Sequence, residues 1–168
     1  MSTSTAGGAA GRGAPRVLRV ALGADHAGVG LKQVLRRFLE EERGVAVIDL
    51  GTHSEDSVDY PVYAQRVAEA VTQGHAEQGL LVCGTGVGVG IAANKFRGVR
   101  AAMVSEPASA RLAREHNNAN ILCLGSRIVG VDLAKQILDA WLAASFQNGR
   151  HQRRLNQISE IEQTGKIA

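Results

Sequence analysis

The sequence predicts an α/β fold, in which a parallel sheet carries helices on both of its faces. Short apolar runs of strand length alternate along the chain with segments whose apolar residues recur at helical spacing. The chain has 168 residues, the length of one domain with its own core. Polar side chains follow the apolar runs, a pattern typical of a binding site at the carboxyl ends of parallel strands.

Five apolar runs are expected to form the sheet, over 17–22, 45–50, 79–82, 99–104 and 121–124. Helices are expected between these strands and after the last one. The first begins near Leu31 and ends at Gly44, and the second begins at Pro61. The remaining helices are expected over 91–95, 107–115, 133–142 and 155–161.

Residues 1–16 differ in composition from the rest of the chain. They are rich in Ser, Thr, Gly and Ala and contain no apolar segment of the kind that a signal peptide needs. They are expected to form a disordered extension, and residues 17–168 to form a single domain that ends in a helix.

The bulk composition narrows the range of partners. Aromatic residues make up 4% of the chain, too few to suggest a stacking surface for nucleic acid, and no apolar run is long enough to span a membrane. The net charge of +3 suits a small anionic substrate. Neither nucleic acid nor a membrane is expected as a partner. The two cysteines, Cys83 and Cys123, make no disulfide framework, which favours a reducing, cytoplasmic location.

The segment 79–95 carries the strongest chemical signal. An apolar strand ends on Cys83, and glycines then alternate with other residues, among them Thr85, before a helix begins: Gly84, Gly86, Gly88 and Gly90. Such a turn points several backbone N–H groups at one place, which favours an anion, and the start of a helix stabilises a thiolate. The segment therefore predicts a nucleophile or base beside an oxyanion site.

Two other interpretations of this segment are weaker. Gly88, Gly90 and Ala93 match the spacing of a dinucleotide-binding loop, but they follow the third strand rather than the first. A phosphate-binding loop of the NTPase kind is excluded because Lys95 stands between Asn94 and Phe96. Cys123 lies inside an apolar run and is interpreted as a structural residue.

Other candidate residues end a strand or a helix. Asp25 and His26 follow the first strand, and His116 and Asn117 end the fourth helix. Each pair suits contacts to a polar substrate or proton transfer, and each could equally cap a helix.

Basic residues suggest where an anion binds. Arg127 follows the fifth strand, and Arg150 and Arg154 share one face of the last helix. They form either a phosphate clamp or a solvated basic surface. The five histidines have no metal-ligand spacing with a cysteine or with one another, so no metal is expected.

The chain resembles the ribose-5-phosphate isomerase type B family, in a wider group that includes the galactose-6-phosphate isomerase subunits. The likeness spans about residues 17–163 and is carried by these stretches: 23–28, 49–52, 59–61, 83–88, 91–95, 116–117, 124–127 and 149–154. Some members of the family place a glutamate base in the glycine loop. This chain has Cys83 and is similar to the cysteine-containing kind.

The resemblance implies a Rossmann-like three-layer α/β/α sandwich with strand order 2-1-3-5-4. It implies a homodimer or tetramer with the active site between subunits. It also implies reversible conversion of ribose 5-phosphate to ribulose 5-phosphate in the pentose phosphate pathway, with no metal and no cofactor.

The resemblance also implies a role for each candidate. Cys83 would move a proton between C2 and C1 through an enediolate that the glycine-loop amides stabilise, and Thr85 would pass a proton between O1 and O2. His116 and Asp25 would open the furanose as acid and base. Tyr60 and Asn117 would contact hydroxyls, and the phosphate would be held by His26, Arg127, Arg150 and Arg154.

Three alternatives stay open. The substrate could be a six-carbon sugar phosphate, such as allose or galactose 6-phosphate, because pocket length cannot be deduced from the sequence. The chain could be a sugar-phosphate-binding module without activity, although Cys83, Thr85 and His116 are all present. It could also be a nucleotide-binding oxidoreductase, which would bind NAD.

Overall fold

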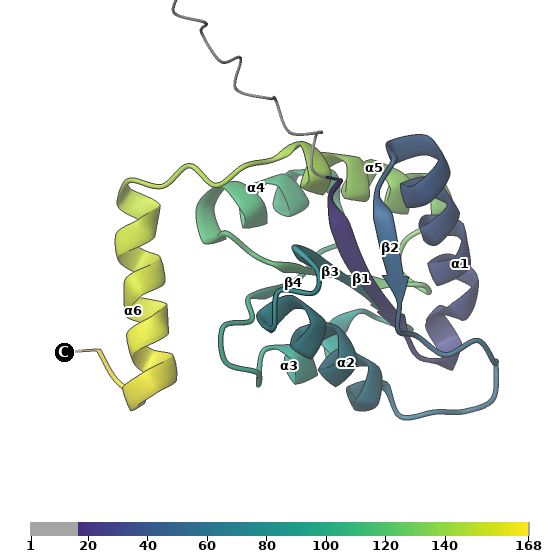
Figure 1. The fold of residues 1–168 in the computed structure, drawn as a ribbon, viewed down its shortest axis with the longest axis horizontal. Helices are drawn as coiled ribbons and strands as arrows, with labels where there is room; N and C mark the ends of the chain where they lie inside the picture. The colour runs from purple at the N-terminus through teal and green to yellow at the C-terminus, as the bar shows by residue number, and fades with distance from the viewer. Residues whose placement is uncertain (1–16, 168) are drawn as a thin grey trace, which may run out of the picture.

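The sheet of this protein is parallel throughout, with the strand order β2-β1-β3-β5-β4. This order is seen in the computed structural model, which describes residues 17–167 (Figure 1). The strands are β1 (Arg19–Ala24), β2 (Ala46–Asp49), β3 (Gln78–Cys83), β4 (Ala101–Met103) and β5 (Ile121–Gly125). The expected strand order is confirmed, whereas the expected extension over 1–16 lies outside the described residues.

Helices cover both faces of the sheet. The short turn η1 (His26–Gly28) leads into α1 (Val29–Arg37), which continues as η2 (Phe38–Glu42). The other helices are α2 (Tyr60–Thr72), α3 (Val87–Ala93), α4 (Pro107–Asn117), α5 (Val131–Ala143) and α6 (Arg150–Thr164). Figure 1 shows α1, α4 and α5 on one face and α2 and α3 on the other, while α6 stands beside this sandwich.

The core consists of two apolar clusters separated by the sheet. Successive residues of a strand point to opposite faces, so Leu80 packs towards α1, α4 and α5, whereas Leu81 packs towards α2 and α3. Trp141 lies in the first cluster, and its indole N–H donates to Gln78 Oε1 at 2.6 Å. The buried polar atoms of this pair therefore satisfy each other.

Several elements differ from their expected extent: α6, for example, begins at Arg150 rather than near Leu155, and β1 covers Arg19–Ala24 rather than 17–22. For α3 and β4 the cause is local. Helix α3 begins at Val87, earlier than expected, because Gly86 takes a left-handed φ of 78° and turns the chain directly into the helix. Strand β4 is shorter than expected. The Val99 N–H donates to Phe96 O and the Arg100 N–H donates to Asn120 Oδ1, so neither N–H is available to the ladder.

Within residues 17–167, none of the helices has both the length and the apolar character that crossing a bilayer requires.

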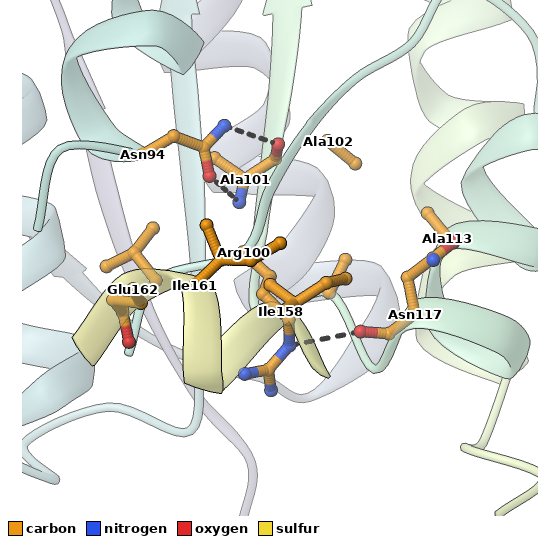
Figure 2. A pocket seen from close by; sticks show the side chains of 11 residues that line it. Asn94, Arg100, Ala101, Ala102, Ala113, Asn117, Ile158, Ile161 and Glu162 are labelled. Carbon is orange, nitrogen blue, oxygen red and sulfur yellow. Dashed lines mark hydrogen bonds between the residues drawn. The ribbon is translucent and has the colours of Figure 1, made fainter. Parts of the chain in front are cut away.

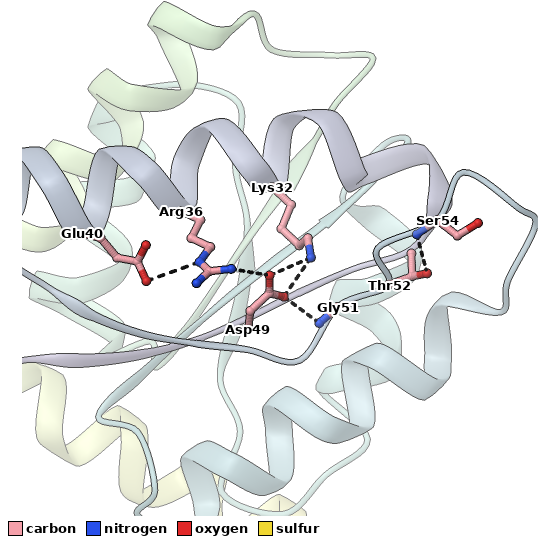
Figure 3. A network of polar contacts seen from close by, with 7 residues as sticks. All are labelled: Lys32, Arg36, Glu40, Asp49, Gly51, Thr52 and Ser54. Atoms are coloured by element: carbon pink, nitrogen blue, oxygen red, sulfur yellow. Dashed lines mark hydrogen bonds and ion pairs between the residues drawn. The ribbon is translucent and has the colours of Figure 1, made fainter.

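A buried ion pair joins α1 to the carboxyl end of β2, between Lys32 and Asp49 (Figure 3). The side chain of Lys32, in α1, is 0% exposed, and its Nζ lies 2.8 and 2.9 Å from the two carboxylate oxygens of Asp49. Asp49 Oδ1 also accepts from the Gly51 N–H at 3.1 Å. Asp49 Oδ2 also lies 3.6 Å from Arg36 Nη1, so the carboxylate would keep one cation if Lys32 were removed. Removing Asp49, in contrast, would leave the Lys32 ammonium buried without its counter-charge.

This ion pair fixes the chain beside Asp25. A β-carbon at Gly51 would lie 2.8 Å from Lys32 Cδ and 2.7 Å from Ala24 N, so the chain passes closely between them. The next residue, Thr52, donates its N–H to Ala24 O at 3.0 Å. The ion pair thus holds the end of β1 and the segment after β2 in one arrangement.

We expect Asp49→Asn to lower the free energy of unfolding by about 3–5 kcal/mol, because it leaves the Lys32 ammonium buried without its counter-charge. Urea denaturation measures this loss. Adding Lys32→Met should restore much of the lost stability. As a control, Asp139→Asn breaks the exposed Arg43–Asp139 ion pair and should cost at most about 1 kcal/mol. Equal stability of the Asp49→Asn single variant and the double variant would contradict this account.

Candidate active site

The sulfur of Cys83 is held at the carboxyl end of β3. The residue is 5% exposed, and its Sγ accepts a hydrogen bond from the Gly86 N–H at 3.1 Å. A β-carbon at Gly86 would lie 2.8 Å from the Leu124 carbonyl carbon, so glycine is required here for space as well as for its φ. The turn therefore directs a main-chain N–H group at the sulfur.

The chain after β5 closes over this turn. Ser126 and Arg127 donate their N–H groups to Cys83 O and Gly84 O at 2.8 and 3.0 Å. The Ser126 hydroxyl donates to Ala27 O at 2.8 Å. The loops after β1, β3 and β5 are therefore joined at one edge of the sheet, as the strand-end pattern predicted.

Two predicted binding residues, Arg127 and Tyr60, lie against the glycine segment. The guanidinium carbon of Arg127 lies 3.5 Å from where a β-carbon of Gly84 would stand. The ring of Tyr60, the first residue of α2, approaches the corresponding position of Gly88 to 2.8 Å. Thr85, which lies between Gly84 and Gly88 in the sequence, is exposed, and its Oγ1 accepts from the Val87 N–H at 3.3 Å. A cation, a phenol and a hydroxyl thus surround the loop that Cys83 begins.

Asp25 and His26 lie in the loop after β1, at the same edge. Asp25 is 6% exposed and caps η1, since its Oδ1 accepts from the Gly28 N–H at 3.1 Å. His26 Nδ1 accepts from the Val58 N–H at 3.1 Å. The neutral His26 ring therefore carries its proton on Nε2, which can donate to a ligand.

The remaining predicted residues form a second cluster. His116 and Asn117 end α4, and the His116 ring stacks on His151 at 4.2 Å with 9° between the planes. Arg150 and Arg154 flank His151 in the first turns of α6 and are exposed. Burial lowers the pKa of His151, and the charges of His116 and of both arginines lower it further. This ring is thus neutral near pH 7, in a strongly cationic setting.

The two clusters lie at opposite edges of the sheet. Asn117 and the turn after it precede the first residue of β5, whereas Ser126, which contacts Cys83, follows the last. With a rise of about 3.3 Å per residue, the length of β5 alone separates them by roughly 13 Å. A pocket of about 500 Å³ adjoins the second cluster, between α4, the β4 edge and α6 (Figure 2). A single chain therefore presents Cys83 and His116 on different surfaces.

Cys123 belongs to the core, as expected. Its thiol is fully buried, and burial, with a smaller effect of Cys83, raises its pKa, so it stays protonated. In the part of the chain that the structure describes, no three His, Cys, Asp or Glu side chains are grouped to hold a metal ion.

Two residues that frame these clusters were not among the predicted ones. Lys32 supports the first cluster, and a lysine beside Leu31 on the apolar face of its helix was the available signal. Arg100 supports the second cluster through its side chain, and no pattern in the sequence indicated it.

The chain is similar to known proteins over most of its length. The sequence pattern of the ribose/galactose isomerase family matches residues 20–158. Ribose-5-phosphate isomerase B of Escherichia coli (strain K12) is 54% identical over 145 residues, covering 86% of this chain and 97% of that protein.

Solved structures agree with this likeness. Ribose-5-phosphate isomerase B of Clostridium thermocellum superposes with a TM-score of 0.86 at 50% identity, covering 89% of this chain and 100% of that one. The Mycoplasma genitalium enzyme, solved with bound ribulose-5-phosphate, gives a TM-score of 0.83 at 42% identity, covering 88% and 97%. Since sequence and fold agree over nearly the whole described chain, this protein belongs to the ribose/galactose isomerase family.

Proposed function

We propose that this chain is a ribose-5-phosphate isomerase, which interconverts ribose 5-phosphate and ribulose 5-phosphate through an enediolate. The observation that carries the proposal is the Cys83 sulfur, which accepts a hydrogen bond from the Gly86 N–H at the start of α3, while Arg127 lies against the neighbouring Gly84. The high identity to ribose-5-phosphate isomerase B supports this substrate over a six-carbon one.

The first cluster supplies the groups for proton transfer. Cys83, as thiolate, takes the proton from C2 of the open aldose and returns it to C1. The negative charge that develops on the enediolate oxygens is stabilised by amide N–H groups in the first turn of α3, at Gly88 and its neighbours. Thr85, exposed beside the sulfur, passes a proton between O1 and O2.

Ring opening and phosphate binding draw on groups from both clusters. His116 gives a proton to the ring oxygen, while Asp25 takes one from the C1 hydroxyl, and Asn117 and Tyr60 bind hydroxyls. The phosphate is held by hydrogen-bond donors from both clusters: the Nε2–H of His26 and the guanidinium groups of Arg127, Arg150 and Arg154.

Because these clusters lie at opposite edges of one chain, we infer a homodimer in which each active site combines the first cluster of one copy with the second cluster of the other. Apolar side chains support such a contact. Val87 and Ile91 of α3 are 48% and 54% exposed, and Ile158 and Ile161 of α6 are 46% and 45% exposed.

Both cysteines are free thiols, which suits a protein that works in a reducing cytoplasm.

Replacing the base tests the function directly. We expect Cys83→Ala to lower the turnover of ribose 5-phosphate by about 10²- to 10⁴-fold, because no other thiolate replaces it. Cys123→Ala, which removes the other sulfur, is the matched control and should keep activity. A spectrophotometric assay with a chelator present measures both, with a six-carbon sugar phosphate compared in parallel. Full turnover by Cys83→Ala would exclude the thiolate as base.

Mixing two inactive variants tests the shared site. Cys83→Ala and His116→Ala chains should each be nearly inactive alone. After subunit exchange, half of the dimers are hybrids with one intact site each, so about a quarter of wild-type activity should return. If both groups came from the same chain, mixing would restore nothing.

Removing one cation tests the phosphate clamp. Arg154→Ala should raise KM about 10- to 100-fold, since a charge-assisted hydrogen bond contributes about 1.5–3 kcal/mol. Arg153→Ala, one residue away and off that helix face, is the matched control and should leave KM unchanged. An unchanged KM in Arg154→Ala, with a normal thermal unfolding profile, would remove this residue from the clamp.

A further inference from the structure

Arg100 binds the carbonyl groups at the end of α4. Its Nε lies 3.0 Å from Asn117 O and 3.1 Å from Asn118 O, and its Nη2 lies 2.9 Å from Asn118 O. Figure 2 shows the guanidinium directed at the Asn117 carbonyl. The last carbonyl groups of a helix accept no hydrogen bond from within the helix. The Arg100 side chain therefore provides donors for carbonyl groups that would otherwise bind water.

The backbone of Arg100 binds the other side of the same turn. Its N–H donates to Asn120 Oδ1 at 2.8 Å, and its carbonyl accepts from the Asn120 N–H at 3.0 Å. Between these contacts Asn118 takes a left-handed φ of 42°, which is unfavourable for a residue with a β-carbon. Arg100 thus fixes both sides of the turn that follows His116 and Asn117.

Partial burial of the Arg100 guanidinium costs free energy, and the C-terminus of α4 offsets this cost. The guanidinium is half-buried, and burial lowers the pKa of Arg100, whereas Glu162 of α6 raises it. A positive charge is favourable at a helix C-terminus, where the carbonyl dipoles point outward. A neutral hydrogen-bond donor could cap the carbonyls but would lose this electrostatic gain.

Arg100 also lies where α6 contacts the domain. Glu162 Oε1 accepts from the Gly98 N–H at 2.9 Å, two residues before Arg100. Helix α6 carries Arg150 and Arg154, so the segment 98–100 is in contact with both elements of the second cluster. A second arginine, Arg114, donates to Ala119 O from the side of Trp141 at 2.6 Å and does not reach the Asn117 carbonyl.

We infer that Arg100 is a positioning residue for ring opening, which holds the end of α4 so that His116 and Asn117 meet the furanose in the right geometry. This inference rests on the proposed function, because it assumes the roles of both residues. Arg100 itself does not touch the reacting atoms.

The chemistry separates ring opening from proton transfer. Ribose 5-phosphate closes through O4 and must be opened before C2 can lose its proton. Ribulose 5-phosphate cannot close a furanose, because its O5 carries the phosphate. When the base removes a C1 proton from ribulose 5-phosphate and a deuteron from D₂O returns to C1, the ketose exchanges hydrogen without any ring step.

The test measures two rates in Arg100→Gln: turnover of ribose 5-phosphate, which needs ring opening, and C1 hydrogen exchange of ribulose 5-phosphate, which does not. We expect turnover of ribose 5-phosphate to fall at least about tenfold, since a misplaced catalytic group costs up to about 10²-fold. C1 exchange of ribulose 5-phosphate in D₂O, followed by proton NMR, should stay within about twofold of wild type, because Cys83 and the α3 amides are untouched. Arg100→Lys keeps the charge but loses the planar guanidinium, so its turnover of ribose 5-phosphate should lie between those of wild type and Arg100→Gln.

Reference variants make the result decisive. His116→Ala should show the same split as Arg100→Gln, and Cys83→Ala should lose both rates. Arg97→Gln, an exposed residue nearby, should change neither. Equal loss of both rates in Arg100→Gln, or no loss of turnover, would overturn the positioning role. If instead Cys83→Ala kept both rates, the proposed function itself would fail, whatever Arg100→Gln did.

Discussion

The arrangement of this protein depends on one constraint of parallel sheets: every strand ends at the same edge, and each helix must return the chain to the other edge. Cys83 ends β3, while Asp25 and Arg127 follow the ends of β1 and β5, and the contacts of Ser126 with Cys83 and Ala27 join these loops at one edge. His116 stands at the end of a returning helix, so it lies at the opposite edge. No loop adjustment within a single copy can bring these two groups together, which is why the proposed site needs a second copy.

The glycine segment shows how close packing outweighs local preference. Each glycine in α3 weakens the helix by up to about 1 kcal/mol relative to alanine. Yet the Tyr60 ring fills the space beside Gly88, and a β-carbon at Gly90 would lie 2.4 Å from the Met103 side chain. The short helix is therefore stabilised by its neighbours rather than by its own sequence. In return, its first turn approaches the Cys83 sulfur with main-chain amides instead of side chains.

The strands and much of the first cluster could be predicted from the sequence, because they follow from local apolar runs. Features that depend on packing between distant segments could not. Apolar runs identified all strands, and the strand-end rule brought Cys83, Asp25 and Arg127 to one edge. The start of α3 was placed too late, because glycines suggest a loop until their packing partners are known. Lys32 and Arg100 could not be assigned, because their importance comes from burial against distant segments, Asp49 in one case and the end of α4 in the other.

The two clusters differ in how firmly the single chain holds them. The first is set by the sheet itself and by the buried Lys32–Asp49 pair, so its geometry is built into the core. The second depends on α6, which contacts the domain through His151 stacking, buried Leu155 and the Glu162–Gly98 hydrogen bond, and leaves Ile158 and Ile161 largely exposed. Arg100 lies where this looser element meets the end of α4. A partner surface that covers the exposed isoleucines would complete the second cluster, so that dimerisation and assembly of the ring-opening groups become a single event.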